Sequence, residues 1–415
     1  MSRVLAIHRY YWPDTPPYAS ILRTIAAEWT RSGHTVDVLT SQPSYKPEAL
    51  AARRPCVEQV DSVTVRRVCM RPDRTSRLRR VFNVVWFPLV VAFRILIGRR
   101  YDVVMCSTVP PVLLGWAVSV AAGVRRSSFI YHCMDLHPEI GRLSGEFSHP
   151  IVYRILHRME LATCRRAAAI VVLSEDMREA VLARDPDLAR KLVVLTNFEL
   201  PDFDGSDELP ASPLPTNAER LRVVFTGNLG RFQGLETITR AVLSPGRELA
   251  DIELVFMGEG AAKPELQRMV EQAPSTVRSR VAFVPHGAPA SVRALLATSD
   301  LGLVSLTPEV IRFAYPSKTA TYLGAGLPVL VAVEPDSCLA RTVEDAGIGG
   351  LLPVHDAAQT GRQLVRWLAR REELPGMSAA AKTVWAEEFA AERLLPRWNE
   401  LLETVVRGTP AEATQ

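Results

Sequence analysis

The sequence predicts an α/β protein made of two Rossmann-like, doubly wound domains that face each other across a cleft. Strand and helix patterns alternate over about the first 200 residues, a proline-rich segment interrupts them, and the alternation then resumes. Strand–helix–strand units at this spacing are typical of a parallel sheet covered by helices on both faces. Ligands of such sheets bind beyond the carboxyl ends of the strands, so two of these domains imply a cleft between them.

The first domain is expected over residues 1–205. An amphipathic helix at 19–31, closed by Gly33, connects its first two strands, and Ser174 before Glu175 is a typical helix start. Its buried strands are expected at residues 4–7, 35–40, 103–105, 129–131 and 169–173.

The second domain is expected over residues 219–382. Residues 200–220 form the expected linker, because four prolines lie there among Asp, Ser and Gly with little apolar periodicity. The buried strands of this domain are expected at residues 221–225, 252–256, 281–284, 301–304 and 327–333.

The composition is that of a globular protein, with 47% apolar and 23% charged residues and no low-complexity tract. Its six cysteines are scattered without a C-x-x-C pair, which argues against a disulfide framework or a zinc site and indicates a reducing cytoplasm. The apolar stretch Val4–Ile7 is too short for a secretory signal, so we expect no signal peptide.

Positive charge is concentrated near the N-terminus, where residues 1–100 contain 17 Arg and Lys against 7 Asp and Glu. Within this region, only Asn83 and Arg94 are strongly polar between Val81 and Ile97, and arginines flank both ends. The apolar run favours an anionic membrane over nucleic acid as the partner, but it is marginal for crossing a bilayer of about 30 Å. An interfacial helix, docked on a membrane through residues 77–100, fits better; a core helix flanked by arginine is the alternative.

The most informative motif runs from Pro316 to Val329. Its proline suits a first helical turn, Ser317 is placed to cap the helix, and the backbone amides beside Lys318 form an anion site. Gly324 and Gly326 end this helix before an apolar strand. The motif resembles the donor-phosphate helix of retaining glycosyltransferases of family 4, which have the GT-B fold. The resemblance covers nearly the whole chain and is nearest to a subgroup that acts in bacterial surface-polysaccharide synthesis.

The resemblance implies a donor site in the second domain. Arg231 and Lys318 are the expected cations for the diphosphate, because two fixed positive charges stabilise a leaving nucleoside diphosphate without a metal. We therefore expect neither a metal nor a cofactor. The other expected donor-binding residues are Gly227, Asn228, Gly230, Gln233, Gly258, His286, Ser317 and Thr321. The family usually has a glutamate on the ribose at the position of Thr321, so we expect altered ribose recognition.

The first domain is expected to bind the acceptor. His132 and Asp135 follow a buried strand in a motif similar to the family's, which implies that His132 reaches the donor sugar and that Asp135 lies near the acceptor. The other expected acceptor residues are Asp14, Tyr18 and Glu139. The family also implies that the last helix, expected at residues 383–407, packs back on the first domain.

Three functions are compatible with these motifs. The leading one is a retaining, metal-independent hexosyltransferase that moves a sugar from a nucleoside-diphosphate sugar to a lipid-linked or small-molecule acceptor. The others are a sugar-nucleotide epimerase with the same donor site, and a glycosyltransferase-like binding protein without turnover. We expect a cytoplasmic protein, peripheral on the inner face of the plasma membrane, with no nucleic-acid partner.

Overall fold

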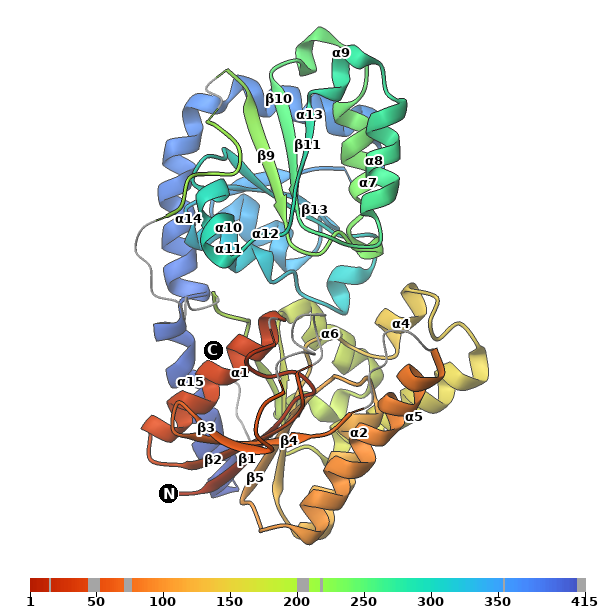
Figure 1. Ribbon diagram of the computed structural model, residues 1–415, viewed down its shortest axis with the longest axis vertical. Helices are drawn as coiled ribbons and strands as arrows, with labels where there is room; N and C mark the ends of the chain where they lie inside the picture. Colours follow the sequence, from red (N-terminus) through yellow and green to blue (C-terminus); the bar gives the residue numbers. More distant parts are fainter. Residues whose placement is uncertain are drawn as a thin grey trace. The chain divides into compact units, whose positions relative to one another are not determined.

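The computed structural model describes residues 1–14, 16–43, 53–70, 77–199, 209–216, 219–353 and 355–408 (Figure 1). The chain divides into two compact units. Unit 1 comprises Met1–Pro201, Arg312–Tyr315 and Ala391–Gln415, and unit 2 comprises Asp202–Ile311 and Pro316–Ala390. Of the expected linker at 200–220, residues 200–208 and 217–218 lie outside the described residues, as does the expected domain end at residue 205.

Unit 1 is built on a largely parallel sheet with the order β3-β4-β2-β1-β5-β6-β7-β8 in the described part of the chain. Only the β3–β4 pair is antiparallel there; Asp61 and Ser62 connect these two strands, both at positive φ. The strands are β1 Arg3–Ile7, β2 Thr35–Ser41, β3 Val57–Val60, β4 Val63–Val68, β5 Val103–Ser107, β6 Ser128–His132, β7 Ala169–Val172 and β8 Leu192–Val194. The five strands expected from the sequence are therefore confirmed.

Helices cover both faces of this sheet. One face packs against α1 and α15, and the other packs against α2, α3, α5 and α6. The helices of unit 1 are α1 Pro17–Arg31, α2 Arg77–Ile97, α3 Leu113–Arg125, α4 Glu139–Leu143, α5 Pro150–Arg166, α6 Glu175–Arg184 and α15 Ala391–Arg407, with a 3₁₀ turn at Pro186–Lys191. Ser174 caps α6, because its hydroxyl accepts a hydrogen bond from the Met177 amide at 3.2 Å.

Unit 2 is built on a parallel sheet with the order β11-β10-β9-β12-β13-β14. Its strands are β9 Leu221–Thr226, β10 Ile252–Met257, β11 Val281–Val284, β12 Leu301–Ser305, β13 Val329–Ala332 and β14 Gly349–Leu351. The first five of these strands coincide with expected ones, although β13 is shorter than the expected strand at 327–333.

The helices of unit 2 connect these strands. They are α7 Leu235–Val242, α8 Lys263–Gln272, α9 Ser275–Arg278, α10 Pro289–Leu296, α11 Lys318–Gly324, α12 Cys338–Asp345, α13 Ala357–Ala369 and α14 Leu374–Glu388. Short 3₁₀ turns lie at Arg231–Gln233, Arg247–Leu249, Val310–Arg312 and Arg371–Glu373. Helices α7, α8 and α13 pack their apolar faces on the core of this sheet.

The prediction of one continuous helix at residues 383–407 is wrong. Helix α14 ends at Glu388 and α15 begins at Ala391, and α14 belongs to unit 2 whereas α15 belongs to unit 1. The break separates two different burial patterns, since Leu394, Trp398 and Leu402 of α15 all enter the core of unit 1.

Helix α2 is apolar on two faces. Phe87, Val91 and Ile95 are buried in the core of unit 1, whereas Trp86 and Phe93 are 42% and 59% exposed. In the described part of the chain, no helix has the length and apolar character that a membrane crossing requires.

Candidate functional site

In unit 1, polar side chains meet at the carboxyl ends of three adjacent strands. His8 follows β1, Ser107 ends β5 and His132 ends β6. The chain runs outward from β1 to β2 on one side, and β5 lies on the other side of β1. Such a reversal of strand order is where open α/β sheets bind ligands. His8 Nδ1 and the Ser107 hydroxyl are joined there by a short hydrogen bond.

His132 and Tyr18 are brought together at this point, as two of the residues expected in the site. The Tyr18 hydroxyl and His132 Nδ1 are hydrogen-bonded at 2.9 Å, and the Tyr18 ring packs edge-on against His8 with the ring centroids 4.5 Å apart. The other ring nitrogen of His132, Nε2, is buried and has no hydrogen-bond partner among the described residues. A buried nitrogen without a partner is costly, so we interpret Nε2 as a ligand-binding atom.

Both histidines of this group are uncharged near neutral pH. Burial lowers the pKa of His132 to about 3, and burial together with the neighbouring His132 lowers the pKa of His8 to about 3. A neutral imidazole offers one donor and one acceptor, so these rings can form hydrogen bonds but do not supply charge.

Asp135 lies three residues beyond β6 and is half-buried. Burial raises the pKa of its carboxyl to about 6. The segment Arg312–Tyr315, which belongs to unit 1, pairs with this loop: Ala314 forms an antiparallel bridge with Asp135, and the Leu136 amide donates to the Phe313 carbonyl at 2.7 Å. A backbone contact distant in sequence therefore fixes the Asp135 loop.

The remaining residues expected near the acceptor have different surroundings. Asp14 is buried at 4% exposure and lies in the loop after β1. Glu139 begins α4 and forms an ion pair with Arg184, whose side chain is only 5% exposed. Because the guanidinium of Arg184 also donates to the His137 carbonyl at 3.1 Å, Glu139 helps to hold α4 against the end of α6.

In unit 2, the loops after β9 and β10 are held against each other by backbone hydrogen bonds. The Gly227 amide donates to the Met257 carbonyl and the Leu229 amide donates to the Glu259 carbonyl, both at 2.9 Å. A Cβ on Gly258 would lie 1.9 Å from the Gly227 carbonyl oxygen, so only glycine permits this approach. The paired loops lie at the carboxyl end of the sheet, where sheets of this kind bind ligands.

Side chains of the expected donor loop divide into structural and exposed ones. Gln233 holds the loop: its Oε1 accepts the Gly230 amide at 2.5 Å, and its carbonyl accepts the Ser305 hydroxyl. Asn228 and Arg231 are exposed. Arg231 has no carboxylate within 4.0 Å among the described residues, so its charge is available to a ligand.

Lys318 begins α11 and lies over β9. Its ammonium is 4.0 Å from the centroid of the Phe225 ring, and burial lowers its pKa to about 8. Tyr322, one turn later, accepts the Thr226 amide at 2.8 Å through its hydroxyl and is fully buried. This bond fixes α11 at the end of β9, beside the reversal of strand order between β9 and β12.

The prediction that the Ser317 side chain caps α11 is wrong. Ser317 itself has helical dihedrals, and its side chain makes no capping hydrogen bond; the side chain is exposed. The expected end is confirmed at Gly326, whose φ of +68° allows the Leu327 amide to reach the Tyr322 carbonyl at 2.8 Å. Thr321, at the ribose position, is half-buried, and His286, after β11, is exposed.

Four residues near these strand ends were not predicted as site residues. Like His132, Ser107 ends a buried strand, and His8 directly follows one; this position at the carboxyl end of a strand is the sequence signal that identifies them. Trp398 of α15 packs against His132 with ring centroids 4.9 Å apart, and Tyr322 anchors α11. No local pattern identifies these last two contacts, because their partners are distant in sequence.

Residues 18–197 match the family described as glycosyl transferase 4-like domain. Over 320 residues, the chain is 26% identical to a Pseudomonas aeruginosa protein named "Probable glycosyltransferase WbjE", covering 73% of this chain and 76% of the relative. It is 23% identical over 335 residues to the Escherichia coli K12 protein named "Putative colanic acid biosynthesis glycosyl transferase WcaI", covering 76% of this chain and 80% of the relative.

Solved structures share the fold. Sucrose-phosphate synthase from Thermosynechococcus elongatus matches with a TM-score of 0.72 and 17% identity, over 99% of this chain and 100% of that chain. Anabaena HepE in complex with UDP-glucose matches with a TM-score of 0.66 and 14% identity, over 97% of this chain and 100% of that chain. The fold is therefore GT-B, and the resemblance drawn from the sequence is confirmed.

Proposed function

We propose that this chain, a glycosyltransferase with a glycosyl transferase 4-like domain and the GT-B fold, transfers a sugar from a nucleoside-diphosphate sugar to a lipid-linked acceptor. The transfer is retaining and metal-independent in this proposal. The observation that carries it is Lys318, a half-buried cation beside glycine loops at the reversal of strand order in unit 2. The HepE structure with UDP-glucose supports a nucleotide sugar as the donor.

Unit 2 supplies the groups for the departing diphosphate. Negative charge grows on the leaving oxygen in the transition state, and fixed donors aimed there lower the barrier. Lys318 and Arg231 supply cations, and the loops at Gly227 and Gly258 let the backbone approach the phosphates. Neither cation has a carboxylate partner within 4.0 Å among the described residues, so neither charge is neutralised before the donor binds.

Unit 1 supplies the groups for the sugar and the acceptor. In this proposal the Tyr18 hydroxyl donates to His132 Nδ1, which leaves the proton on Nε2, and Nε2–H then donates to a hydroxyl of the donor sugar. Asp135, with a carboxyl pKa of about 6, accepts a hydrogen bond from the acceptor hydroxyl. A transfer on one face of the sugar needs both partners to be oriented, which hydrogen bonds of this kind provide.

A membrane surface is the proposed location of the acceptor. The outer face of α2 exposes Phe82, Trp86, Leu89 and Phe93, between 42% and 59% each. Exposed apolar patches of this kind mark interaction sites, and arginines at the end of the helix add attraction to anionic lipid. In this proposal the protein is cytoplasmic and docks peripherally through α2.

The test is donor turnover with and without acceptor. The purified protein, given a panel of nucleoside-diphosphate sugars, is expected to release nucleoside diphosphate from one of them only when a lipid-linked acceptor is present. Arg231→Ala is expected to lower this turnover about 10²- to 10³-fold, because it removes a charge from the leaving diphosphate. Arg240→Ala, an exposed arginine on α7, is the matched control and should keep wild-type turnover.

The other functions predict different products. An epimerase produces the epimeric nucleotide sugar without acceptor, and a binding protein retains the donor without turnover. Either result contradicts the proposed transfer, and normal turnover in Arg231→Ala removes Arg231 from the mechanism.

A further inference from the structure

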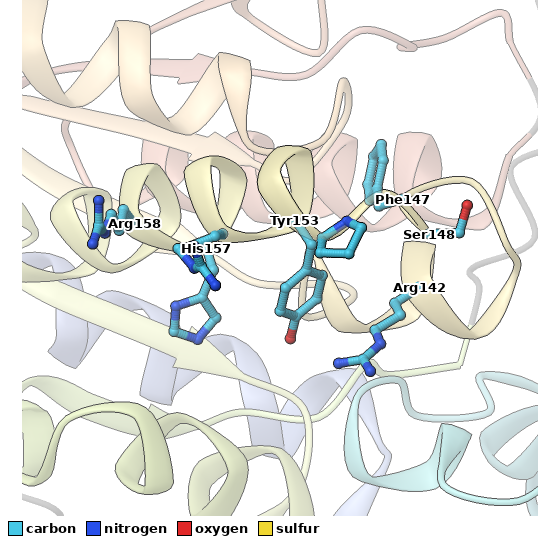
Figure 2. Close-up of a pocket in the computed structure, with 8 residues that line it drawn as sticks. Arg142, Phe147, Ser148, Tyr153, His157 and Arg158 are labelled. Carbon is cyan, nitrogen blue, oxygen red and sulfur yellow. The ribbon is translucent and has the colours of Figure 1, made fainter.

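A basic cavity lies in unit 1, between α4 and α5 (Figure 2). Its volume is about 440 Å³, within the range of small-ligand pockets. It is lined by Arg142, Phe147, Ser148, Pro150, Tyr153, Arg154, His157 and Arg158. The lining shares no residue with the group around His132, so the cavity needs a separate explanation.

The cavity carries uncompensated positive charge. Arg142, Arg154 and Arg158 line it, and in the part of the chain that the structure describes none of them has a carboxylate within 4.0 Å. The carboxylate of Glu139 forms an ion pair with the buried Arg184 and also lies 3.8 Å from Nε2 of His157 in the cavity lining, whereas it reaches none of the three arginines. Three arginines around one hollow favour an anion, and their planar, forked donors match phosphate as well as carboxylate.

Aromatic and helix-end groups shape the same hollow. The guanidinium of Arg142 lies 5.1 Å from the centroid of the Tyr153 ring, and Figure 2 shows Tyr153 and His157 pointing to the same side of α5. Helix α5 begins at Pro150 with no acidic residue in its first turn and no side-chain cap. Its N-terminal dipole therefore adds to the positive potential of the arginines.

Exposed apolar side chains adjoin the cavity on the same two helices. Leu143 of α4 and Ile151, Val152 and Ile155 of α5 are between 40% and 59% exposed. Helix α5 packs on α3, and α3 packs on α2, whose outer face is also apolar. A free inorganic phosphate gains no binding energy from this apolar surface, whereas the hydrocarbon chain of a lipid phosphate can pack against it.

We propose that the α4–α5 cavity binds the phosphate or diphosphate group of a lipid, with its hydrocarbon chain lying over Leu143, Ile151 and Ile155. This inference rests on the proposed lipid-linked acceptor, and it assigns the position where the lipid's anionic group is held. Arg142, Arg154 and Arg158 bind the phosphate oxygens, and the Tyr153 ring holds Arg142 in place.

Direct binding to the full-length protein tests this assignment without any sugar transfer. The probes are farnesyl diphosphate, inorganic pyrophosphate and farnesol, each titrated by calorimetry. Farnesyl diphosphate is expected to bind more tightly than the other two, since it alone has both the anion and the chain. The triple variant Arg142→Gln/Arg154→Gln/Arg158→Gln is expected to weaken its Kd at least about tenfold, because charge-assisted hydrogen bonds are lost.

A matched control locates the binding. Arg166→Gln, an exposed arginine on the same helix but outside the cavity, is expected to leave the Kd unchanged. The single variant Arg154→Gln, an exposed position, is expected to fold normally by circular dichroism and to show part of the loss.

Two results would overturn the assignment. Unchanged binding in the triple variant excludes the cavity, and equal Kd values for pyrophosphate and farnesyl diphosphate exclude the lipid chain. Neither of these results depends on turnover. A failure of sugar transfer is therefore distinguishable from a failure of lipid binding.

Discussion

At the scale of single residues, Lys318 combines a positive charge with partial burial against an aromatic ring. The motif around it predicted a phosphate site, but its pKa is a property of the folded chain. Burial lowers the pKa of the ammonium to about 8, close to physiological pH. The ammonium of Lys318 is therefore fully protonated well below about pH 8, and it loses its charge as the pH rises through this value.

The affinity for the donor diphosphate is accordingly expected to depend on pH. The Kd of a nucleoside diphosphate should weaken by up to about tenfold per pH unit above about pH 8, as one proton leaves Lys318. In Lys318→Arg the cation keeps its proton throughout, so the dependence between about pH 7 and pH 9 should disappear. Calorimetric titration across this range checks both outcomes.

The control for this prediction is the other lysine near the donor loops. Lys263 donates to Glu259 at 2.6 Å, and Lys263→Arg should retain the wild-type pH profile. A wild-type Kd that does not change across this range would remove Lys318 from diphosphate binding.

In unit 1, the sequence motif identifies some site residues but not the partners of their side chains. His132 was identified from its place after a buried strand, and the structure adds that its Nε2 is buried without a partner among the described residues. Glu139 was expected near the acceptor from the same motif, yet its carboxylate forms an ion pair with Arg184. A motif identifies the residue type and its position at the end of a strand. It does not identify the side chain that the residue pairs with, because that side chain lies on another element.

At the scale of elements, α2 shows features of both interpretations of residues 77–100. The sequence allowed either an interfacial helix or a core helix. In the structure Phe87, Val91 and Ile95 face the core, while Trp86 and Phe93 are exposed on the other side. One face of the helix therefore packs in the core of unit 1 and the other face is exposed, and docking of the exposed face on a membrane stays a prediction.

The exposed face of α2 is expected to bind anionic membranes. In co-sedimentation with phosphatidylglycerol vesicles, the wild type should bind at low salt and detach partly at high salt, which screens the arginines. Trp86→Ser/Phe93→Ser should weaken binding at least about tenfold at either salt, since each buried aromatic contributes about 1.5–3 kcal/mol.

The matched control for α2 is an exposed apolar residue of unit 1 on another element. Val57 on β3 is 53% exposed, and Val57→Ser should leave vesicle binding unchanged. Equal binding by wild type and the α2 variant would assign the exposed face to something other than lipid.

At the scale of the whole molecule, the C-terminal segment belongs to the unit formed by the N-terminal residues. Helix α15 lies against α1, and Figure 1 shows the two side by side in unit 1. Trp398 is 1% exposed; its ring meets Trp29 edge-on and also packs against His132, and its carbonyl accepts the Trp29 indole N–H at 3.3 Å. The last helix therefore contributes both to the core and to the surroundings of a candidate catalytic residue.

Removing the Trp398 side chain should destabilise unit 1 selectively. Trp398→Ala is expected to cost about 3–5 kcal/mol of the unfolding free energy of unit 1, because it leaves a large cavity in a close-packed core. Hydrogen–deuterium exchange should then become faster in β1, β5 and β6 but not in β9, β10 and β12. Val406→Ala, 39% exposed on the same helix, is the control and should change neither set. Faster exchange in both units would contradict the division into two units.

The sequence by itself determined the alternation of strands and helices, the glycine loops of unit 2 and the family resemblance. These features depend on local physics: period, turn chemistry and helix ends. Only the tertiary structure decided that Trp398 meets His132, that Arg312–Tyr315 pairs with the Asp135 loop, and that three arginines of α4 and α5 surround one cavity. Such contacts join residues that no local pattern relates, because they form only when separate elements pack on one core.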